Sequence, residues 1–430
     1  MWSRYTYFFK SKNKCFLYNS LSNSLAELKL EDYEMLENLR ANNLPLADEE
    51  LEKQLRQLKV IVDNDMDEIN KVKYINLLNR NENRRLILTI NPTLACNFNC
   101  PYCFENEHSN IYMHDLVEEK IILFIKKHVG LKALDVTWFG GEPLLAFDRI
   151  VSMTKKMQNL GLNYKAGMIT NGYLLTEKVI SKLESLAISS IQITIDGMAD
   201  LHNTRRCLKS GKPTFDKILQ NIDLLQKVNP QIRLNVRVNV DKTNYADFLE
   251  LYKFLKDKHY PTLNVNLAFV KDMTGCYKCN HSYDMQEQAQ IVKDLLQKYG
   301  LDFSMVFPRS ERYECAIRNR NALVIGPEGE LYKCWNDVGN KSKIIGNIDG
   351  KITNEALLLR YLVAADPFED PKCQECFLLP VCGGGCPYSR IQNEYEGTNI
   401  NTCLYIKDHL KDFLVTHAEY KNHLSSNLNK

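Results

Sequence analysis

Three cysteines stand close together near residue 100 of this 430-residue chain. Cys96, Cys100 and Cys103 occur in the stretch CNFNCPYCFE, directly after the apolar run LILTINPTL. Three thiolates can bind three irons of a four-iron, four-sulfide cluster and leave the fourth iron open to another molecule. A structural zinc site would need a fourth ligand, from His108 or the distant Cys207. Three inert buried thiols fit poorly in so polar a loop, so the cluster is the favoured interpretation.

A second group of cysteines lies near the C-terminus. Its seven members are Cys315, Cys334, Cys373, Cys376, Cys382, Cys386 and Cys403. Four of them form the run C-x2-C-x5-C-x3-C-P, which is close to the bacterial ferredoxin pattern, whose last cysteine binds the other cluster of a pair. A zinc ribbon would separate its two cysteine pairs by about 15 to 20 residues. The spacing therefore favours two iron–sulfur clusters over zinc.

The composition excludes several classes of partner. The chain has 55 basic and 53 acidic residues, so no charge excess favours nucleic acid or a membrane surface. Its N-terminus lacks the apolar core of a signal peptide, and no segment approaches about 18 uninterrupted apolar residues. We expect a cytoplasmic protein, in which the clustered members of the 14 cysteines bind metal instead of forming disulfides.

Strand-like apolar runs alternate with amphipathic helical stretches through the middle of the chain. The six runs cover residues 86–94, 134–140, 165–172, 189–197, 232–240 and 262–270. Such a series predicts an α/β fold of parallel strands with right-handed crossovers, as an open doubly wound sheet or as a full or partial barrel. In either arrangement the loops after the strands hold the chemistry, and the three-cysteine loop follows the first strand.

The two ends of the chain have other patterns. Residues 6–63 contain short strands, helices over LEDYEMLENLR and DEELEKQLRQL, and the strand-like VIVD, which together predict a small winged-helix-like domain. From about residue 310 the elements become short and dense in glycine and cysteine. Something other than a large apolar core must stabilise that region.

Several motifs on successive strands together resemble the radical S-adenosylmethionine (SAM) enzymes. The first is CxxxCxxC with an aromatic residue, Tyr102, before its last cysteine. FGGEPLL follows the second strand, TNG follows the third, QITIDG lies on the fourth, and DGMADLHNTRR comes next. The resemblance covers residues 86 to about 270, and the order of the motifs is more specific than any one of them. It implies a partial (β/α)6 barrel of the radical SAM type.

The resemblance also implies a cofactor site. Cys96, Cys100 and Cys103 would bind a 4Fe-4S cluster, whose open iron holds SAM by its amino and carboxylate groups. An external low-potential electron donor would then allow cleavage of SAM to a 5'-deoxyadenosyl radical, which abstracts hydrogen from substrate. Gly140–Glu142 would approach the methionine amino group and Arg206 the carboxylate. The implied cofactor contacts are Tyr102, Gly140, Gly141, Glu142, Asn171, Thr194, Asp196 and Arg206.

The C-terminal cysteines resemble those of the SPASM domain, which carries two auxiliary iron–sulfur clusters, here expected to be 4Fe-4S. By this resemblance one cluster is bound by Cys373, Cys376, Cys382 and Cys403, and the other by Cys315, Cys334 and Cys386. The second set has three members, so that either one iron is open or a cysteine of the Cys276–Cys279 pair completes it. The expected domains are residues 1–80 (leader recognition), 81–305 (barrel) and 306–430 (SPASM).

The residue after Cys334 bears on the substrate. Sulfatase-maturing relatives carry an aspartate there as a base, whereas this chain has Trp335, with Asp337 nearby. KCW segments resemble the maturases of ribosomally made peptides, and residues 1–80 resemble a domain that binds a leader peptide, although they could merely cap the barrel. We expect an enzyme that cross-links a precursor peptide through a thioether or carbon–carbon bond. The alternatives are an anaerobic sulfatase-maturating enzyme and a non-catalytic iron–sulfur electron carrier.

Overall fold

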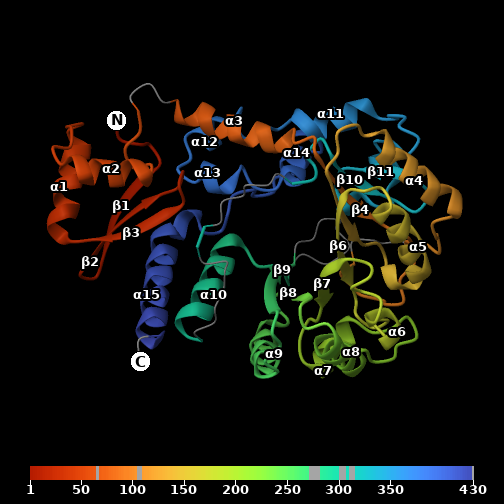
Figure 1. The fold of residues 1–430 in the computed structure, drawn as a ribbon. Coiled ribbons are helices and arrows are strands. Elements are labelled where there is room, and N and C mark those ends of the chain that lie inside the picture. The colour runs from red at the N-terminus through yellow and green to blue at the C-terminus, as the bar shows by residue number, and fades with distance from the viewer. Residues whose placement is uncertain (64–66, 104–108, 271–280, 300–306, 309–314, 429–430) are drawn as a thin grey trace. The chain divides into compact units, whose positions relative to one another are not determined.

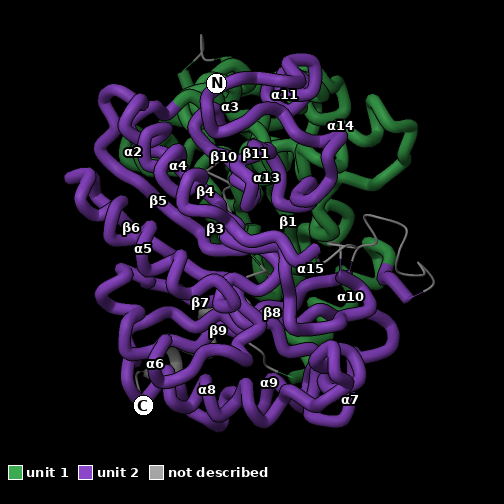
Figure 2. The backbone as a smooth tube through the Cα atoms, turned by 90° about the vertical axis from the view of Figure 1, so that its right-hand side faces the viewer, with its two compact units in different colours: residues 1–81, 284–318, 363–430 green, residues 82–283, 319–362 purple. Residues whose placement is uncertain are grey.

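The computed structural model describes the chain except residues 64–66, 104–108, 271–280, 300–306, 309–314 and 429–430 (Figure 1). The described residues form two compact units (Figure 2). The first comprises residues 1–81, 284–318 and 363–430, and the second comprises residues 82–283 and 319–362. Among the described residues, no helix has the length and apolar character needed to cross a membrane. The division into three consecutive domains stays a prediction.

The second unit is built on one large mixed sheet. Its six central strands are parallel neighbours, in the order in which they occur along the chain. They are β4 (Arg85–Ile90), β5 (Ala133–Trp138), β6 (Asn163–Thr170), β7 (Ile188–Thr194), β8 (Arg233–Val240) and β9 (Leu263–Phe269). This arrangement confirms the six predicted strand and helix units. The strand order ends at β9 without pairing back, so the described sheet is a partial barrel and not a closed one.

Three short strands from the cysteine-rich end extend this sheet beyond β4. They are β10 (Ala322–Ile325), β11 (Glu330–Tyr332) and β12 (Gly346–Asn347). β10 pairs with β4 in parallel, and β11 and β12 continue in antiparallel pairs. Residues 319–362 therefore belong to the same unit as the six-stranded barrel.

The helices of the second unit follow the expected crossover pattern. They are α4 (Asp115–Lys127), α5 (Phe147–Gln158), α6 (Glu177–Ile180), α7 (Ala199–Arg205), α8 (Phe215–Val228) and α9 (Tyr245–Asp257), and α11 (Glu355–Val363) comes after the last strand. In α8, Ile218, Ile222 and Leu225 recur on one face and are fully buried. Alternate residues of β4 are likewise fully buried, so that helices and sheet share one core.

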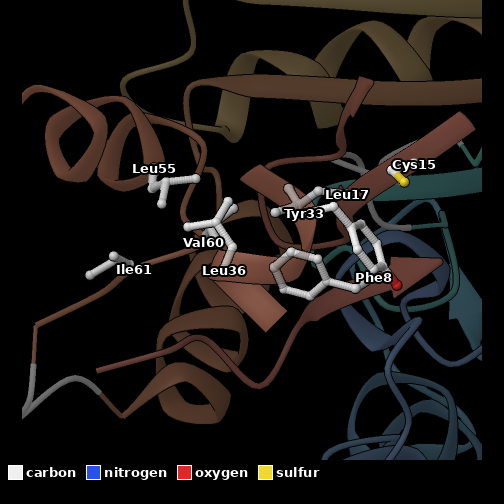
Figure 3. Packing of buried hydrophobic residues seen from close by; sticks show 8 residues of the cluster. All are labelled: Phe8, Cys15, Leu17, Tyr33, Leu36, Leu55, Val60 and Ile61. Carbon is white, nitrogen blue, oxygen red and sulfur yellow. The ribbon is translucent and has the colours of Figure 1, made fainter. Parts of the chain in front are cut away.

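The first unit contains the predicted winged-helix-like pattern. The antiparallel strands β1 (Thr6–Ser11), β2 (Lys14–Asn19) and β3 (Ser24–Leu28) precede α1 (Leu30–Ala41) and α2 (Glu49–Gln57). Trp2 then bridges to Ile61 in the strand-like VIVD. Figure 3 shows the core of this region, where Leu36 of α1 packs with side chains of the sheet and of α2.

The remaining elements of the first unit come from distant parts of the chain. They are α3 (Glu68–Arg80), α10 (Met285–Gln297), α12 (Pro371–Gln374), α13 (Leu379–Cys382), α14 (Pro387–Tyr395) and α15 (Leu410–Leu428). At the end of α3, Arg80 pairs with Asp366 at 2.5 Å, and both side chains are largely buried. Phe9, Phe16 and Tyr18 form a cluster with Leu414 of α15. The N-terminal region is therefore packed against the cysteine-rich end within one unit.

We predict that Leu36→Ala opens the N-terminal sheet. Leu36 is fully buried, and its truncation leaves a cavity that costs about 2–5 kcal/mol. The measurement is hydrogen exchange of the β2 amides by mass spectrometry, in which the opening free energy should fall by that amount. Leu30→Ala is the control because Leu30, on the same helix, is 54% exposed. Equal protection in the two variants would contradict the packing described.

Candidate functional site

The three-cysteine loop is held by hydrogen bonds before it and within it. Before it, the Thr93 hydroxyl donates to the carbonyl of Ile111 at 2.7 Å. Within it, the amide of Phe98 donates to the thiol of Cys96 at 3.5 Å. The amide of Asn99, also within the loop, donates to the carbonyl of Cys207, which lies far along the chain, at 3.0 Å. These contacts hold the loop at the carboxyl end of β4.

The three thiols of this loop are partly buried. Burial raises the pKa of the Cys96 thiol to about 12. Burial also raises the pKa of Cys100, while the positive charge of Arg206 opposes that effect. Metal binding to such thiols must displace their protons, and the cationic Arg206 beside Cys100 favours the thiolate. The donor set therefore fits an iron–sulfur cluster.

The two glycines of FGGEPLL lie directly against the cysteine loop. The Gly141 amide donates to the Thr93 carbonyl at 3.2 Å, and the Glu142 amide donates to the Ala95 carbonyl at 2.8 Å. A Cβ on Gly140 would lie 2.4 Å from the Thr93 oxygen, and one on Gly141 would lie 2.3 Å from the Ala95 oxygen. Gly140 also has a φ of +125°, which favours glycine. Only glycines allow the loops after β4 and β5 to approach this closely.

Glu142 links the second and third strands through a carboxylate that is fully buried. It accepts hydrogen bonds from the Thr170 hydroxyl at 2.7 Å, the Asn171 amide at 2.7 Å and the Leu144 amide at 3.0 Å. Burial raises the pKa of this carboxyl, and the three donors counteract the rise. The side chain of Asn171 in turn donates to the Asn97 side chain of the cysteine loop at 2.7 Å. Glu142 thus positions neighbouring loops, and its predicted contact with the cofactor stays a prediction.

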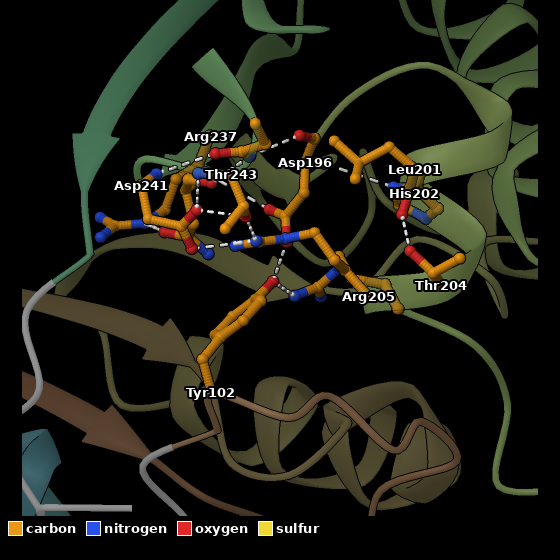
Figure 4. A network of polar contacts seen from close by, with 12 residues as sticks. Tyr102, Asp196, Leu201, His202, Thr204, Arg205, Arg237, Asp241 and Thr243 are labelled. Carbon is orange, nitrogen blue, oxygen red and sulfur yellow. Dashed lines mark hydrogen bonds and ion pairs between the residues drawn. The ribbon is translucent and has the colours of Figure 1, made fainter. Parts of the chain in front are cut away.

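A buried network joins Tyr102 to the fourth and fifth strands (Figure 4). The Tyr102 hydroxyl donates to the carboxylate of Asp196, which is fully buried just beyond β7. The same carboxylate accepts from Arg205 at 3.3 Å. Arg206 donates to the Tyr102 hydroxyl oxygen at 2.7 Å. Three of the predicted cofactor residues, Tyr102, Asp196 and Arg206, are thereby brought together.

Arg205 is a site residue that the sequence did not single out. It lies between two fully buried carboxylates, those of Asp196 and Asp241, and its bond to Asp241 is 2.9 Å long. The Arg205 guanidinium also lies 5.1 Å from the centre of the Tyr102 ring. A buried arginine needs such anionic partners. In the sequence, the adjacent pair Arg205–Arg206 at a helix end was the signal that could have identified Arg205 as a site residue.

Two guanidinium nitrogens of this network have no hydrogen-bond partner among the described residues. They are Nη2 of Arg205 and Nε of Arg206, and both are buried. Unsatisfied buried donors are costly, so that a bound acceptor near them would be stabilising. Arg206, which is 9% exposed, also lies over the Phe98 ring of the cysteine loop at 5.7 Å. This arrangement fits the predicted role of Arg206 as the partner of a carboxylate.

His202 holds the turn between β7 and α8. Its ring is fully buried, accepts from the Asp196 amide at 3.3 Å and contacts the Thr214 hydroxyl at 3.1 Å. Burial, together with the positive charge of Arg206, lowers the pKa of His202 from 6.5 to about 3. The ring is therefore neutral at physiological pH. Thr194, the last residue of β7, lies just before this turn and is 9% exposed.

Four of the C-terminal cysteines line one cavity in the first unit. It has a volume of about 680 Å³ and is lined by Cys373, Cys376, Cys382 and Cys403. Among the described residues, no three His, Cys, Asp or Glu side chains gather close enough for a single metal ion. The four thiols surround a space instead, as a cluster of several irons requires. This cavity fits the auxiliary cluster assigned to the same four residues.

A run of three glycines shapes this cavity. Gly383, Gly384 and Gly385 all have positive φ, which favours glycine. A Cβ on Gly385 would lie 1.9 Å from the Thr402 carbonyl oxygen, so the run brings Cys382 and Cys403 to the same cavity.

The second predicted auxiliary set is distributed over both units. Cys315 and Cys386 belong to the first unit and Cys334 to the second. The Cys276–Cys279 pair, considered as a source of a fourth ligand, lies outside the described residues, as does His108. The assignment of this set stays a prediction.

Trp335 and Asp337 differ sharply in exposure. Trp335 is 47% exposed, and its ring is tilted against Phe139 with the centroids 5.8 Å apart. Asp337 is 1% exposed and accepts from the Tyr361 hydroxyl at 2.7 Å. Beyond Cys334 the exposed group is thus aromatic, while the nearest carboxylate is engaged in the core.

Comparisons with known proteins agree with this geometry. The family model for the radical SAM superfamily matches residues 90–255. A serine-type anaerobic sulfatase-maturating enzyme of Bacteroides thetaiotaomicron is 31% identical over 358 residues, which cover 73% of this chain and 85% of that protein.

Two solved structures have the same fold. The structure of native anSMEcpe with bound AdoMet and Cp18Cys peptide has a TM-score of 0.60 and 20% identity, covering 80% of this chain and 99% of that one. The structure of Streptococcus suis SuiB bound to precursor peptide SuiA has a TM-score of 0.50 and 17% identity, covering 90% of this chain and 95% of that one.

We predict that Gly141→Ala displaces the cysteine loop. The new methyl group would overlap two carbonyl oxygens, at 2.3 and 2.5 Å, at a cost of about 1–3 kcal/mol. Iron and sulfide analysis after anaerobic reconstitution should find about four irons fewer per chain than in the unaltered protein. The control is Gly161→Ala, which has open space around the new Cβ and only left-handed strain. Full iron in Gly141→Ala would show that the close approach is dispensable.

The buried His202 predicts a pH dependence of stability. Because its folded pKa is about 3 and its ordinary value is 6.5, the unfolded chain binds a proton below about pH 6.5 that the folded chain does not. Stability from this group is present above pH 6.5 and falls by about 1.4 kcal/mol per unit as the pH drops toward 3. In urea unfolding, His202→Asn should lose less stability between about pH 6 and pH 5 than the unaltered protein does. The exposed His259 supplies the control His259→Asn, and an unchanged slope in His202→Asn would refute the assignment.

Proposed function

Because this chain belongs to the radical SAM superfamily, we propose that it modifies a precursor peptide made on the ribosome by forming a cross-link between side chains. Membership of the superfamily makes it an oxidoreductase-type enzyme and implies SAM and a 4Fe-4S cluster as cofactors. When bound, these cofactors supply the radical that removes hydrogen from an unactivated carbon. The electron-carrier alternative would leave the motifs that follow the barrel strands without a purpose.

In this proposal the residues of the second unit hold and orient the cofactors. Cys96, Cys100 and Cys103 would bind the cluster, on a loop that Gly140 and Gly141 brace. The unsatisfied Nε of Arg206 would meet the carboxylate of SAM. Tyr102, Asn171, Thr194 and Asp196 lie around the same carboxyl end of the sheet, as their strand positions require.

One observation carries the choice of a cross-linking maturase over formylglycine formation. The position after Cys334 holds the exposed Trp335, and the nearby Asp337 is buried in a hydrogen bond with Tyr361. Neither of these two described residues therefore presents an exposed carboxylate that would take a proton from a serine or cysteine side chain. An exposed aromatic ring beside Phe139 suits contact with a substrate side chain instead.

The N-terminal sheet suits recognition of a leader peptide. β3 is an edge strand whose residues are only partly buried, whereas those of the central strand β2 are almost all buried. An edge strand offers backbone groups to which an extended peptide can add as a further strand. Similarity to SuiB, solved with its precursor peptide SuiA, supports a peptide of this kind.

Sulfatase maturation is the second candidate, and the 31% identity to a serine-type sulfatase-maturating enzyme favours it. Its substrate would also be a peptide segment, and the fold and the cofactors would be the same. In either case the proposal includes two auxiliary 4Fe-4S clusters in the SPASM region, an external low-potential electron donor and a cytoplasmic setting.

The test is the intact mass of the peptide encoded beside this gene, after anaerobic incubation with reconstituted enzyme, SAM and a reductant. Loss of two hydrogens per event is expected because forming a cross-link removes one hydrogen from each partner. Fragmentation then locates the new bond. The control is the enzyme with Cys96, Cys100 and Cys103 replaced by alanine, which should form neither product nor 5'-deoxyadenosine.

A sulfatase peptide is incubated in parallel. An unchanged precursor together with formylglycine in the sulfatase peptide would overturn the cross-linking proposal in favour of the second candidate. Formation of 5'-deoxyadenosine by the alanine variant would overturn the cofactor site itself.

A further inference from the structure

The cavity of Cys373, Cys376, Cys382 and Cys403 contains one arginine whose three nitrogens have three different partners. Arg390 of α14 donates from Nη1 to the Cys373 sulfur at 3.5 Å, from Nη2 to Asp370 at 2.9 Å and from Nε to the carbonyl of Ala365 at 2.9 Å. Its side chain is 11% exposed. The guanidinium is therefore held in one orientation, with one edge toward a cysteine sulfur.

The other donors in this cavity are weaker. Beside Cys382 lie the backbone amides of Gly384 and Gly385, which carry no net charge and oppose the rise that burial causes in the pKa of its thiol. Lys407 reaches the Cys403 sulfur only at 4.0 Å, and it is exposed. Solvent screens an exposed ammonium, whereas a buried guanidinium acts through a medium of lower dielectric constant. Among the described residues that line this cavity, Arg390 is consequently the buried positive charge that hydrogen-bonds a cysteine sulfur.

Hydrogen bonds to ligating sulfurs and the local net charge are the main protein influences on the potential of an iron–sulfur cluster. Reduction adds one negative charge, and a fixed cation that donates to a thiolate stabilises the reduced form more than the oxidised form. We propose that Arg390 raises the reduction potential of the auxiliary cluster bound by these four cysteines through its hydrogen bond to Cys373. This inference rests on the proposed function, since it requires that the cavity hold a cluster.

The orientation of Arg390 depends on its anchors. Asp370 caps the N-terminus of α12, on which Cys373 lies, so that a single carboxylate orients both the cysteine helix and the guanidinium. Asp370 also accepts from the Cys373 thiol at 3.6 Å, but it is 30% exposed whereas Arg390 is 11% exposed, so solvent weakens the negative charge at the sulfur more than the positive one. The geometry makes Arg390 a positioning and tuning residue of the cluster and not a ligand.

The experiment is an anaerobic redox titration of the holoenzyme, followed by electron paramagnetic resonance. In Arg390→Gln, one titration wave should move to lower potential and the others should stay in place. We expect about a tenfold fall in the ratio of reduced to oxidised cluster at a fixed potential, which is about 59 mV for one electron. Arg390→Lys keeps the charge and should move the same wave by less.

Lys372→Met is the matched control. Lys372 lines the same cavity and is exposed, but no hydrogen bond within the described part of the chain joins it to a sulfur. An equal shift in Lys372→Met would show a general charge effect and overturn the role of the Arg390 hydrogen bond. An unmoved wave in Arg390→Gln with full iron content would overturn it too. If Arg390→Gln loses iron, the titration of Arg390→Lys becomes the test. An unchanged reduction potential in Arg390→Lys with full iron content would then overturn the proposal.

A separate measurement distinguishes this inference from the proposed function. The variant with Cys96, Cys100 and Cys103 replaced by alanine should retain the iron of the auxiliary clusters. Absence of iron in that variant would refute the auxiliary clusters themselves, whereas iron without an Arg390 effect would refute only the tuning role.

Discussion

The close approach of two backbone segments, Gly140–Gly141 and Thr93–Ala95, is the constraint on which the cofactor site depends. Any side chain at either glycine would overlap a carbonyl oxygen of the cysteine loop. Because the segments touch, the amide of Glu142 can bond to Ala95 while its buried carboxylate reaches the loop after β6. Contacts within the chain thereby tie three successive strand ends together and position the cysteine loop.

Charged side chains at these strand ends form a buried network. Asp196 and Asp241 compensate Arg205 in a buried network, and Tyr102 carries that network to the cysteine loop. Buried ion pairs contribute little net stability, but they hold their members in one geometry. The Nε of the neighbouring Arg206 is buried and has no hydrogen-bond partner among the described residues. An anionic ligand bound there would accept a hydrogen bond from it. The network thus fixes Tyr102, the residue before Cys103, relative to Arg206.

The cysteine-rich end is likewise shaped by closely packed glycines and by a buried arginine. Glycines with positive φ bring Cys382 and Cys403 to one cavity, and a buried arginine faces a sulfur. The packing of residues 1–81 with this end in one unit joins the candidate leader-binding sheet to the candidate auxiliary cluster. Within the proposed function, peptide recognition and electron handling would therefore share one structural unit.

Local patterns in the sequence determined much of this protein. Cysteine spacing indicated the two kinds of cluster site, and strand periodicity indicated the six parallel strands, because both signals lie within a few neighbouring residues. Tertiary structure alone decided the partners of those residues. The bonds of Glu142, the burial of Asp337, the pairing of Arg205 with Asp241 and the contact of Arg390 with Cys373 all join positions that only folding brings together. The addition of β10 to β4 is of the same kind, since a four-residue strand carries too little local signal to identify its neighbour.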